Sequence, residues 1–147
     1  EKLAIFRRRQ IGLIYQFFNL IPTLNVEENI TLPCELDGQT VDKKRLDKLI
    51  DELGLNGRKT HLPEELSGGQ QQRVSIGRAL INRPAIVLAD EPTGNLDKKN
   101  SDEIVELLRR ANQEYRQTII MITHNLEIAK TADRVIVIED GKIIREG

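Results

Sequence analysis

A pair of glycines stands where a polar segment passes into a helical one, in the stretch LSGGQQQRV at residues 66–74. Ser67 and Gln70 have the spacing of a capping box, in which two side chains satisfy free backbone N–H groups at a helix start. Glycine in a helix costs roughly 1 kcal/mol relative to alanine, so a cap alone does not account for Gly68 and Gly69. A helix N-terminus without side chains lets a phosphate approach closely, and the stretch predicts such a contact. The alternative is a helix cap with no ligand.

Two adjacent acids, Asp90 and Glu91, stand directly after the apolar run at residues 86–89. A carboxylate at the end of a buried strand is a usual protein ligand for Mg²⁺ in nucleotide-hydrolysing folds, where the pattern is called a Walker B motif. A second carboxylate beside it can orient or deprotonate an attacking water molecule. The pair therefore predicts metal-assisted hydrolysis, and the alternative is two solvated acids at a strand end.

Single polar residues also follow two other apolar segments. Gln16 comes after residues 11–15, and His124 comes after residues 118–123. Taken alone, each is typical of a loop or of a structural position. Their order is more informative: Gln16, LSGGQ at 66–70, Asp90-Glu91, GNLD at 94–97 and then His124. This order resembles that of the nucleotide-binding domain of ATP-binding-cassette (ABC) proteins, and the resemblance covers essentially the whole chain.

The resemblance implies a role for each polar residue at a strand end. Asp90 would hold the magnesium ion, and Glu91 would be the catalytic glutamate. Gln16 would reach both magnesium and the attacking water, and would sense the membrane partner. His124 would contact the γ-phosphate of ATP.

The resemblance also implies that two segments act across a dimer. The signature segment would contact the γ-phosphate of ATP held by a second copy of the chain, through Ser67, Gly68, Gly69 and Gln70. Asp97 belongs to the D-loop, which would link the two sites. The implied cofactors are ATP and Mg²⁺. The implied partners are a second copy of the chain and transmembrane permease subunits, with no nucleic acid.

Apolar strands alternate with amphipathic helices, which predicts an α/β fold with a parallel sheet. The expected strands are residues 11–15, 85–89 and 118–123, and the expected helices are residues 41–53, 68–82, 98–114 and 126–130. The continuous apolar run at 85–89 predicts a strand that is buried on both faces.

Local signals add two further expectations. Asn25 and Glu28 form a capping box for a short helix, which Pro33 is expected to limit. Asp140-Gly141 predicts a hairpin turn between residues 134–139 and 142–145.

The resemblance sharpens the fold class to a P-loop NTPase-type parallel sheet with an inserted helical subdomain. The subdomain is expected at about residues 22–75, and the catalytic core at residues 1–21 and 76–147. One departure is that no G-x-x-x-x-G-K-[ST] stretch occurs. In the family this Walker A loop and its strand lie N-terminal to the Gln16 segment. We therefore interpret the chain, which begins at Glu1, as a piece of a longer protein that lacks its Walker A strand.

This interpretation carries expectations for the piece alone. The longer protein should be an ATPase, whereas residues 1–147 alone should bind ATP weakly and be inactive. The segments at 118–123 and 134–139 should each expose an apolar strand edge. Such edges are templates for pairing with another chain, so the piece should associate through them or shift its last segment.

Composition limits the other functional classes. The chain has 147 residues, of which 39% are hydrophobic and 31% are charged, and its net charge is −1. These values are ordinary for one globular domain, and the missing basic excess argues against a nucleic-acid binder. Cys34 is the only cysteine, so a reducing cytoplasmic setting fits. No apolar run reaches the ~18–20 residues that cross a bilayer.

The sequence thus predicts the ATP-hydrolysing subunit of an ABC transporter, peripheral on the inner face of the cell membrane, that powers export or release through separate membrane subunits. LADEPTGNLD and YQFFNLIPTLNVEENI resemble the group with macrolide and peptide exporters and lipoprotein-releasing ATPases. One alternative is a soluble ABC ATPase of DNA repair or chromosome organisation. Those proteins carry long coiled-coil arms where this chain has only about fifty residues. The other alternative is a non-catalytic interaction fragment.

Overall fold

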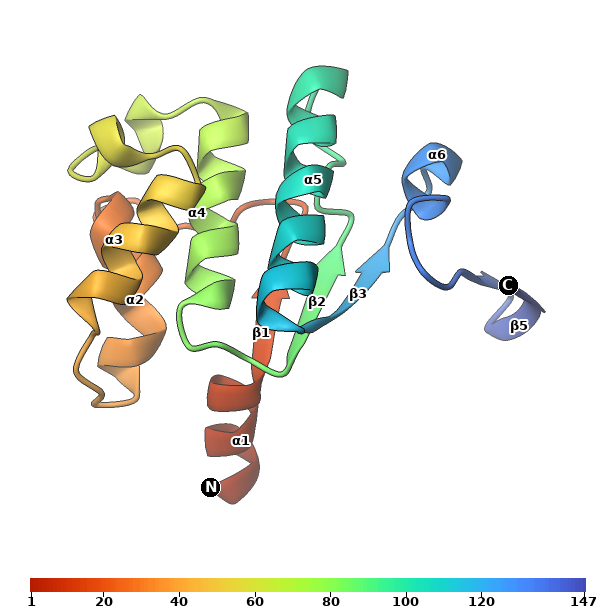
Figure 1. The fold of residues 1–147 in the computed structure, drawn as a ribbon, viewed down its shortest axis with the longest axis horizontal. Helices are drawn as coiled ribbons and strands as arrows, with labels where there is room; N and C mark the ends of the chain where they lie inside the picture. Colours follow the sequence, from red (N-terminus) through yellow and green to blue (C-terminus); the bar gives the residue numbers. More distant parts are fainter.

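Three parallel strands form the centre of the computed structural model, which describes residues 1–147 (Figure 1). They are β1 (Ile11–Ile14), β2 (Ile86–Asp90) and β3 (Thr118–Ile122), in the order β1-β2-β3. In the register, Ile14 lies opposite Ala89 and Asp90 lies opposite Ile122. The carboxyl ends of the three strands therefore meet at one edge. The predicted α/β class with a parallel sheet is confirmed.

One face of this sheet is covered by the helices α4 (Gly68–Leu80) and α5 (Lys98–Tyr115), as Figure 1 shows. Val87 and Ala89 point into a core of 20 buried residues, whereas Leu88 between them is exposed. The prediction that residues 85–89 are buried on both faces is wrong. The reason is that helices cover only one face, so burial alternates along β2 although the residues are apolar throughout.

Two further helices, α2 (Val26–Leu36) and α3 (Lys43–Glu52), lie on the far side of α4 from α5 (Figure 1). The predicted capping box is present: Glu28 N donates to Asn25 Oδ1 at 2.9 Å, and Asn25 N donates to Glu28 Oε2 at 2.8 Å. Pro33 does not limit the helix as predicted, because α2 continues past it to Leu36. Gly38 then has a φ of +67°, a left-handed conformation that suits glycine and turns the chain away.

The segment between α3 and α4 holds two short 3₁₀ helices, η1 (Asn56–Arg58) and η2 (Pro63–Glu65). A single hydrophobic core runs from α2 and α3 through α4 to the sheet and α5. The boundary between a helical subdomain at 22–75 and a catalytic core at 1–21 and 76–147 stays a prediction.

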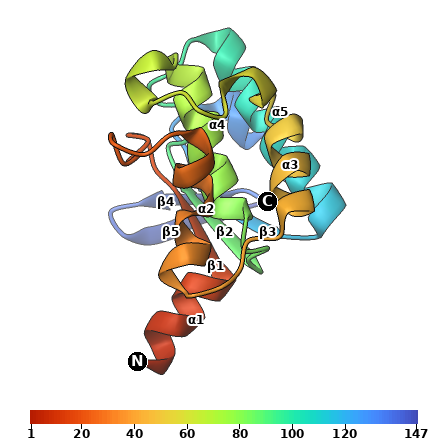
Figure 2. The same ribbon diagram turned by 90° about the vertical axis from the view of Figure 1, so that its left-hand side faces the viewer.

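The helix α1 (Lys2–Gln10) was not expected from the sequence. It has no buried residue, and Figure 2 shows it extending away from the rest of the molecule. Two charged contacts fasten it: Arg8 Nη1 and Arg9 Nε donate to the carboxylate of Asp37 at 3.1 and 2.7 Å. Such ion pairs to a distant residue do not appear as a periodic apolar pattern in the sequence, which is why this helix was not predicted.

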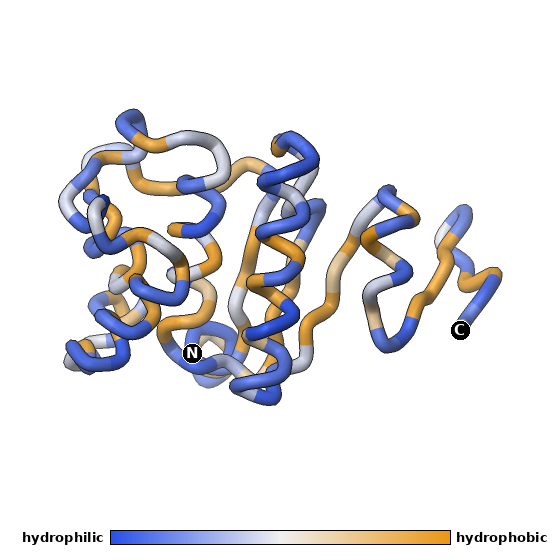
Figure 3. Tube along the Cα trace, turned by 45° about the horizontal axis from the view of Figure 1, so that its top comes forward, coloured by the Kyte–Doolittle hydropathy of each residue, from blue (hydrophilic) through white to orange (hydrophobic).

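The last part of the chain comprises α6 (Leu126–Ala129) and the hairpin of β4 (Ile136–Glu139) and β5 (Lys142–Glu146). The predicted turn is present, with φ of +49° at Asp140 and +73° at Gly141. The hairpin forms a sheet of its own and does not pair with β3. Figure 3 shows its apolar stretches at the end of the molecule where the C-terminus lies. Association of copies through these strands stays a prediction.

Candidate functional site

The edge where the three strands end brings polar residues from distant parts of the chain together. Glu91 directly follows β2, and its backbone N–H donates to the carbonyl oxygen of Ile122, the last residue of β3, at 2.9 Å. Gln16 and His124 each follow their strands by two residues. Parallel pairing therefore places Gln16, Glu91 and His124 along one edge of the sheet.

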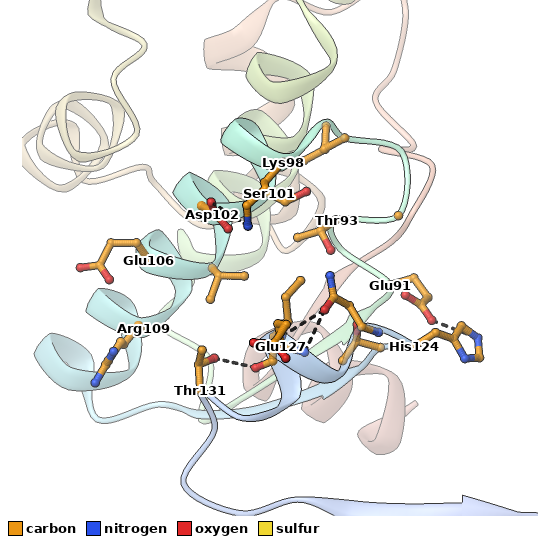
Figure 4. A pocket seen from close by; sticks show the side chains of 16 residues that line it. Glu91, Thr93, Lys98, Ser101, Asp102, Glu106, Arg109, His124, Glu127 and Thr131 are labelled. Atoms are coloured by element: carbon orange, nitrogen blue, oxygen red, sulfur yellow. Dashed lines mark hydrogen bonds and ion pairs between the residues drawn. The ribbon is translucent and has the colours of Figure 1, made fainter.

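Glu91 and His124 are in direct contact, as the dashed line in Figure 4 marks. His124 Nε2 lies 3.2 Å from Glu91 Oε1, although this oxygen is buried and lacks a partner with hydrogen-bond geometry. The imidazole is 96% exposed, whereas the glutamate side chain is 18% exposed. The φ of Glu91 is +46°, a strained conformation for a residue with a side chain. Such strain persists where the surrounding structure holds a residue in place.

A second contact joins Gln16 to the loop after Glu91. Asn95 Nδ2 donates to the backbone oxygen of Gln16 at 3.1 Å, and Gln16 Nε2 donates to Asn95 Oδ1 at 3.4 Å. Gly94 lies under this amide, since a Cβ there would stand 2.7 Å from Gln16 Nε2. The glycine therefore provides the space in which the Gln16 side chain lies.

The carboxylate of Asp90 is free to bind a metal ion, but other groups would have to complete the coordination. Its side chain is exposed at the end of β2 and makes no hydrogen bond or ion pair. No group of three or more His, Cys, Asp or Glu side chains is arranged to hold a metal ion. Mg²⁺ is commonly held by one or two carboxylates together with phosphate and water oxygens, so Asp90 fits it. The Oε1 of Gln16 accepts no hydrogen bond and also fits, but no contact joins it to Asp90.

The start of α4 has the predicted capping box. Ser67 N donates to Gln70 Oε1 at 3.0 Å, and Gln70 N donates to Ser67 Oγ at 3.2 Å. The two glycines between them differ. A Cβ on Gly69 would stand 2.2 Å from Asn100 Oδ1, so packing against α5 requires this glycine. A Cβ on Gly68 would meet nothing closer than 3.7 Å, so packing within the chain does not require that one.

Asp97 is occupied as the N-cap of α5. Its Oδ1 accepts hydrogen bonds from Asn100 N at 2.8 Å and from Asn100 Nδ2 at 2.9 Å. These bonds stabilise the carboxylate and hold the pKa of Asp97 below its usual value. The role of Asp97 in contacting a second copy stays a prediction.

A hollow of about 760 Å³ opens beside Glu91 and His124 (Figure 4). Most of the residues that line it are polar, and they come from α5, α6 and the segments that follow β2 and β3. Figure 4 shows Ser101 and Asp102 of α5 on one side and Glu127 of α6 on another. No function was predicted for these helical residues from the sequence, because their spacing does not indicate that they line one hollow.

Gln72 is a further residue near the site that was not predicted from the sequence. It is fully buried, and its Nε2 donates to the carbonyl oxygens of Tyr15 at 3.1 Å and Pro92 at 2.5 Å. A signal was available: Gln72, Ile76 and Leu80 recur at intervals of four residues, and both aliphatic members are buried. A glutamine on the apolar face of a helix is a candidate for a buried hydrogen-bonding role.

Comparison with known proteins identifies the family of this chain. The family model described as ABC transporter matches residues 2–94. An ABC transporter ATP-binding protein of Mycobacterium tuberculosis is 47% identical over 143 residues, which are 96% of this chain and 58% of that protein. The macrolide export ATP-binding/permease protein MacB of Rhodopirellula baltica is 44% identical over 149 residues, which are 99% of this chain and 22% of that protein.

A solved structure has the same fold. The ATP-binding cassette MJ0796, as a dimer in a post-hydrolysis state bound to ADP and Pi, superposes with a TM-score of 0.86 at 39% identity. The match covers 99% of this chain and 66% of that chain. The fold and the family match thus define an ATP-binding cassette. The chain belongs to the family of ABC transporter ATP-binding proteins, and it spans 58% of the M. tuberculosis relative.

Proposed function

We propose that this chain is part of an ATPase subunit that hydrolyses ATP to drive an ABC transporter. The observation that carries the proposal is the contact between Glu91 and His124 at the end of β2, beside the unpaired carboxylate of Asp90. A carboxylate next to a phosphate-binding metal ion can orient an attacking water. Family membership supports ATP as the nucleotide.

Each residue at the sheet edge has a proposed role. Asp90 and Gln16 are the residues of this chain that would hold Mg²⁺, which supplies charge neutralisation on the phosphates when bound. The Glu91 carboxylate, with one oxygen buried and the other free to bond, orients the attacking water. His124 is almost fully exposed and meets the γ-phosphate from solvent. The polar hollow gives water a path to this edge.

A second copy would complete the site. The helix start at Ser67, Gly68, Gly69 and Gln70 offers backbone N–H groups to the γ-phosphate of ATP bound to that copy. Gly68 is exposed, and a Cβ there would make only ordinary van der Waals contacts, 3.7 Å from Leu96 and 3.8 Å from Phe18, which supports a contact from outside the chain as the reason for glycine. The dimeric form of the MJ0796 cassette supports the pairing of two copies.

A groove of about 460 Å³ is a candidate surface for the membrane partner. It lies between α1, β1, α2 and α4 and includes Tyr15, the residue before Gln16. Leu36, which lines the groove, exposes its apolar side chain, and so does Phe17, the residue after Gln16. None of the helices has the length and apolar character that crossing a lipid bilayer requires. A permease subunit in this groove would hold the protein on the inner face of the membrane and would carry the exported or released substrate.

The direct test is phosphate release by the full-length gene product, measured with its permease subunits and ATP, with and without Mg²⁺. We expect hydrolysis only with Mg²⁺. Absence of hydrolysis in a folded complex that binds ATP would contradict the proposal. Residues 1–147 alone should bind ATP weakly in calorimetry. Tight Mg²⁺-dependent binding by this piece would contradict the expectation that ATP binding requires a Walker A loop.

A further inference from the structure

Gln72 is a fully buried polar side chain near the proposed site. Its exposed fraction is 0%, and its Nε2 reaches two backbone oxygens, Tyr15 O at 3.1 Å and Pro92 O at 2.5 Å. A side-chain amide has two N–H donors, and both are used here. Because both partners can only accept, the orientation of the amide is fixed: Oε1 in the same place would face two acceptors.

The positions of these two oxygens connect Gln72 with the site. Tyr15 directly precedes Gln16, and Pro92 directly follows Glu91. A single side chain therefore holds the backbone next to both residues. Glu91 has a strained φ of +46°, and a strained residue keeps its conformation only where its neighbours are fixed.

The other end of this connection is the start of α4. Gln72 lies on the same helix as Gly68, within two turns of the capping box. α4 is tied to its surroundings by arginines: Arg73 Nη1 donates to Leu53 O at 3.1 Å, and Arg78 Nη2 donates to Phe18 O at 3.0 Å. The backbone hydrogen bonds of α4 make the helix itself rigid, so a displacement of its start would be carried to Gln72.

The amide at this position carries a cost that an aliphatic side chain would avoid. Oε1 of Gln72 is buried and has no hydrogen-bond partner, and an unsatisfied buried acceptor destabilises a fold. Ile76 and Leu80 show that the same face of α4 packs aliphatic side chains well. A buried polar atom without a partner requires an explanation, and the two donated bonds supply one.

We propose that Gln72 is a positioning residue for ATP hydrolysis, which holds the loops of Gln16 and Glu91 in one geometry and links both to the signature end of α4. This inference rests on the proposed roles of those two residues. Contact of Gly68 with nucleotide on the second copy would shift α4, and the two bonds of Gln72 would pass that shift to both loops at once.

The test compares Gln72→Met with Gln113→Met in the full-length gene product. Methionine keeps the length of the side chain and removes the donors. Gln113 is the control, because it is exposed on α5 and its side chain makes no hydrogen bond. Loss of loop positioning should lower kcat about 10- to 100-fold while KM for ATP stays unchanged, since Gln72 does not touch nucleotide. Gln113→Met should retain wild-type kcat.

Hydrogen exchange on the same variants separates positioning from general destabilisation. Gln72→Met should speed amide exchange at residues 15–18 and 91–95 while α4 stays protected. A wild-type kcat in Gln72→Met would overturn the proposal. Faster exchange throughout α4, together with a KM for ATP that rises as much as kcat falls, would also overturn it. If Gln72→Met does not fold, Gln72→Glu keeps the size and, when ionised, cannot donate; the same outcomes apply. If the wild-type protein does not hydrolyse ATP, the proposed function fails, while exchange at the two loops still decides the link.

Discussion

Gln16 and Asn95 exchange hydrogen bonds although 79 residues separate them in the sequence. Asn95 Nδ2 donates to the backbone oxygen of Gln16 at 3.1 Å, and Gln16 Nε2 donates to Asn95 Oδ1 at 3.4 Å. The segment after β1 and the segment after β2 are therefore joined at the surface as well as through the buried Gln72. The proposed metal and water contacts of Gln16 depend on this junction.

Asn95→Ala should weaken the junction without unfolding the protein, because Asn95 is exposed and both bonds lie at the surface. We expect kcat for ATP hydrolysis by the full-length gene product to fall about tenfold, because a misplaced catalytic group reacts more slowly. The melting temperature should stay near the wild-type value. Steady-state kinetics and calorimetric melting check this, and an unchanged kcat would mean that Gln16 is positioned by other contacts.

Gly94→Ala should have a similar effect for a different reason. The new Cβ would stand 2.7 Å from Gln16 Nε2 and 2.9 Å from its Cδ, so the Gln16 side chain must move. Gly57→Ala is the matched control, since a Cβ there meets nothing within 4 Å. Kinetics of both variants should show a loss of kcat only for Gly94→Ala. Equal activity of the two variants would count against this account of Gly94.

The two glycines of the signature should respond differently to alanine. Gly69→Ala forces Asn100 to move, and overpacking of this kind costs about 1–3 kcal/mol in the free energy of unfolding. Gly68→Ala has room and should keep the stability of the wild type. In the full-length dimer, Gly68→Ala should nevertheless lower ATP turnover, because its methyl group would stand between the helix start and the phosphate. Urea unfolding and turnover assays separate the two effects, and full turnover in Gly68→Ala would argue against a phosphate contact there.

The attachment of α1 should depend on pH through Asp37. The hydrogen bond from Arg9 is the main cause that holds the pKa of Asp37 below its usual value. A lowered pKa in the folded state means that the ionised carboxylate stabilises the fold above the unfolded pKa, about 3.9. This stabilisation is lost as the pH falls through the lowered folded pKa. Asp37→Asn should therefore lower the free energy of unfolding at pH 7 but have little effect at strongly acidic pH.

Urea unfolding followed by circular dichroism at several pH values measures this difference. Asp133→Asn serves as the control, because Asp133 is exposed and makes no hydrogen bond or ion pair. An Asp37→Asn effect that grows on acidification would have the wrong sign and would refute the assignment.

Local signals in the sequence predicted much of the fold. Asn25 and Ser67 each begin a helix through a capping box, and Asp140-Gly141 forms the hairpin turn. These features depend on residues three or four positions apart. The apolar strands were also predicted, but their exposed face was not, because burial depends on which helices lie against the sheet.

Features that depend on distant partners were not predicted. The helix α1 has no apolar face and is held by Asp37, which lies 28 residues from Arg9. Gln72 donates to backbone oxygens 57 and 20 residues away, and backbone oxygens have no residue type that a sequence pattern could reveal. The candidate residues at the strand ends could be named from the sequence, whereas the groups that hold them in place required the structure.

Glu91 is the residue proposed to orient the water that attacks ATP. Glu91→Gln keeps the size of the side chain and removes its charge, and Glu114→Gln is a matched control on an exposed part of α5. The decisive measurement is single-turnover hydrolysis of bound ATP by the full-length gene product. Glu91→Gln should bind ATP as the wild type does and lose about 10²–10⁴-fold in rate, with a stable ATP-bound dimer accumulating, while Glu114→Gln keeps the wild-type rate. A rate near that of the wild type in Glu91→Gln would contradict this role of Glu91.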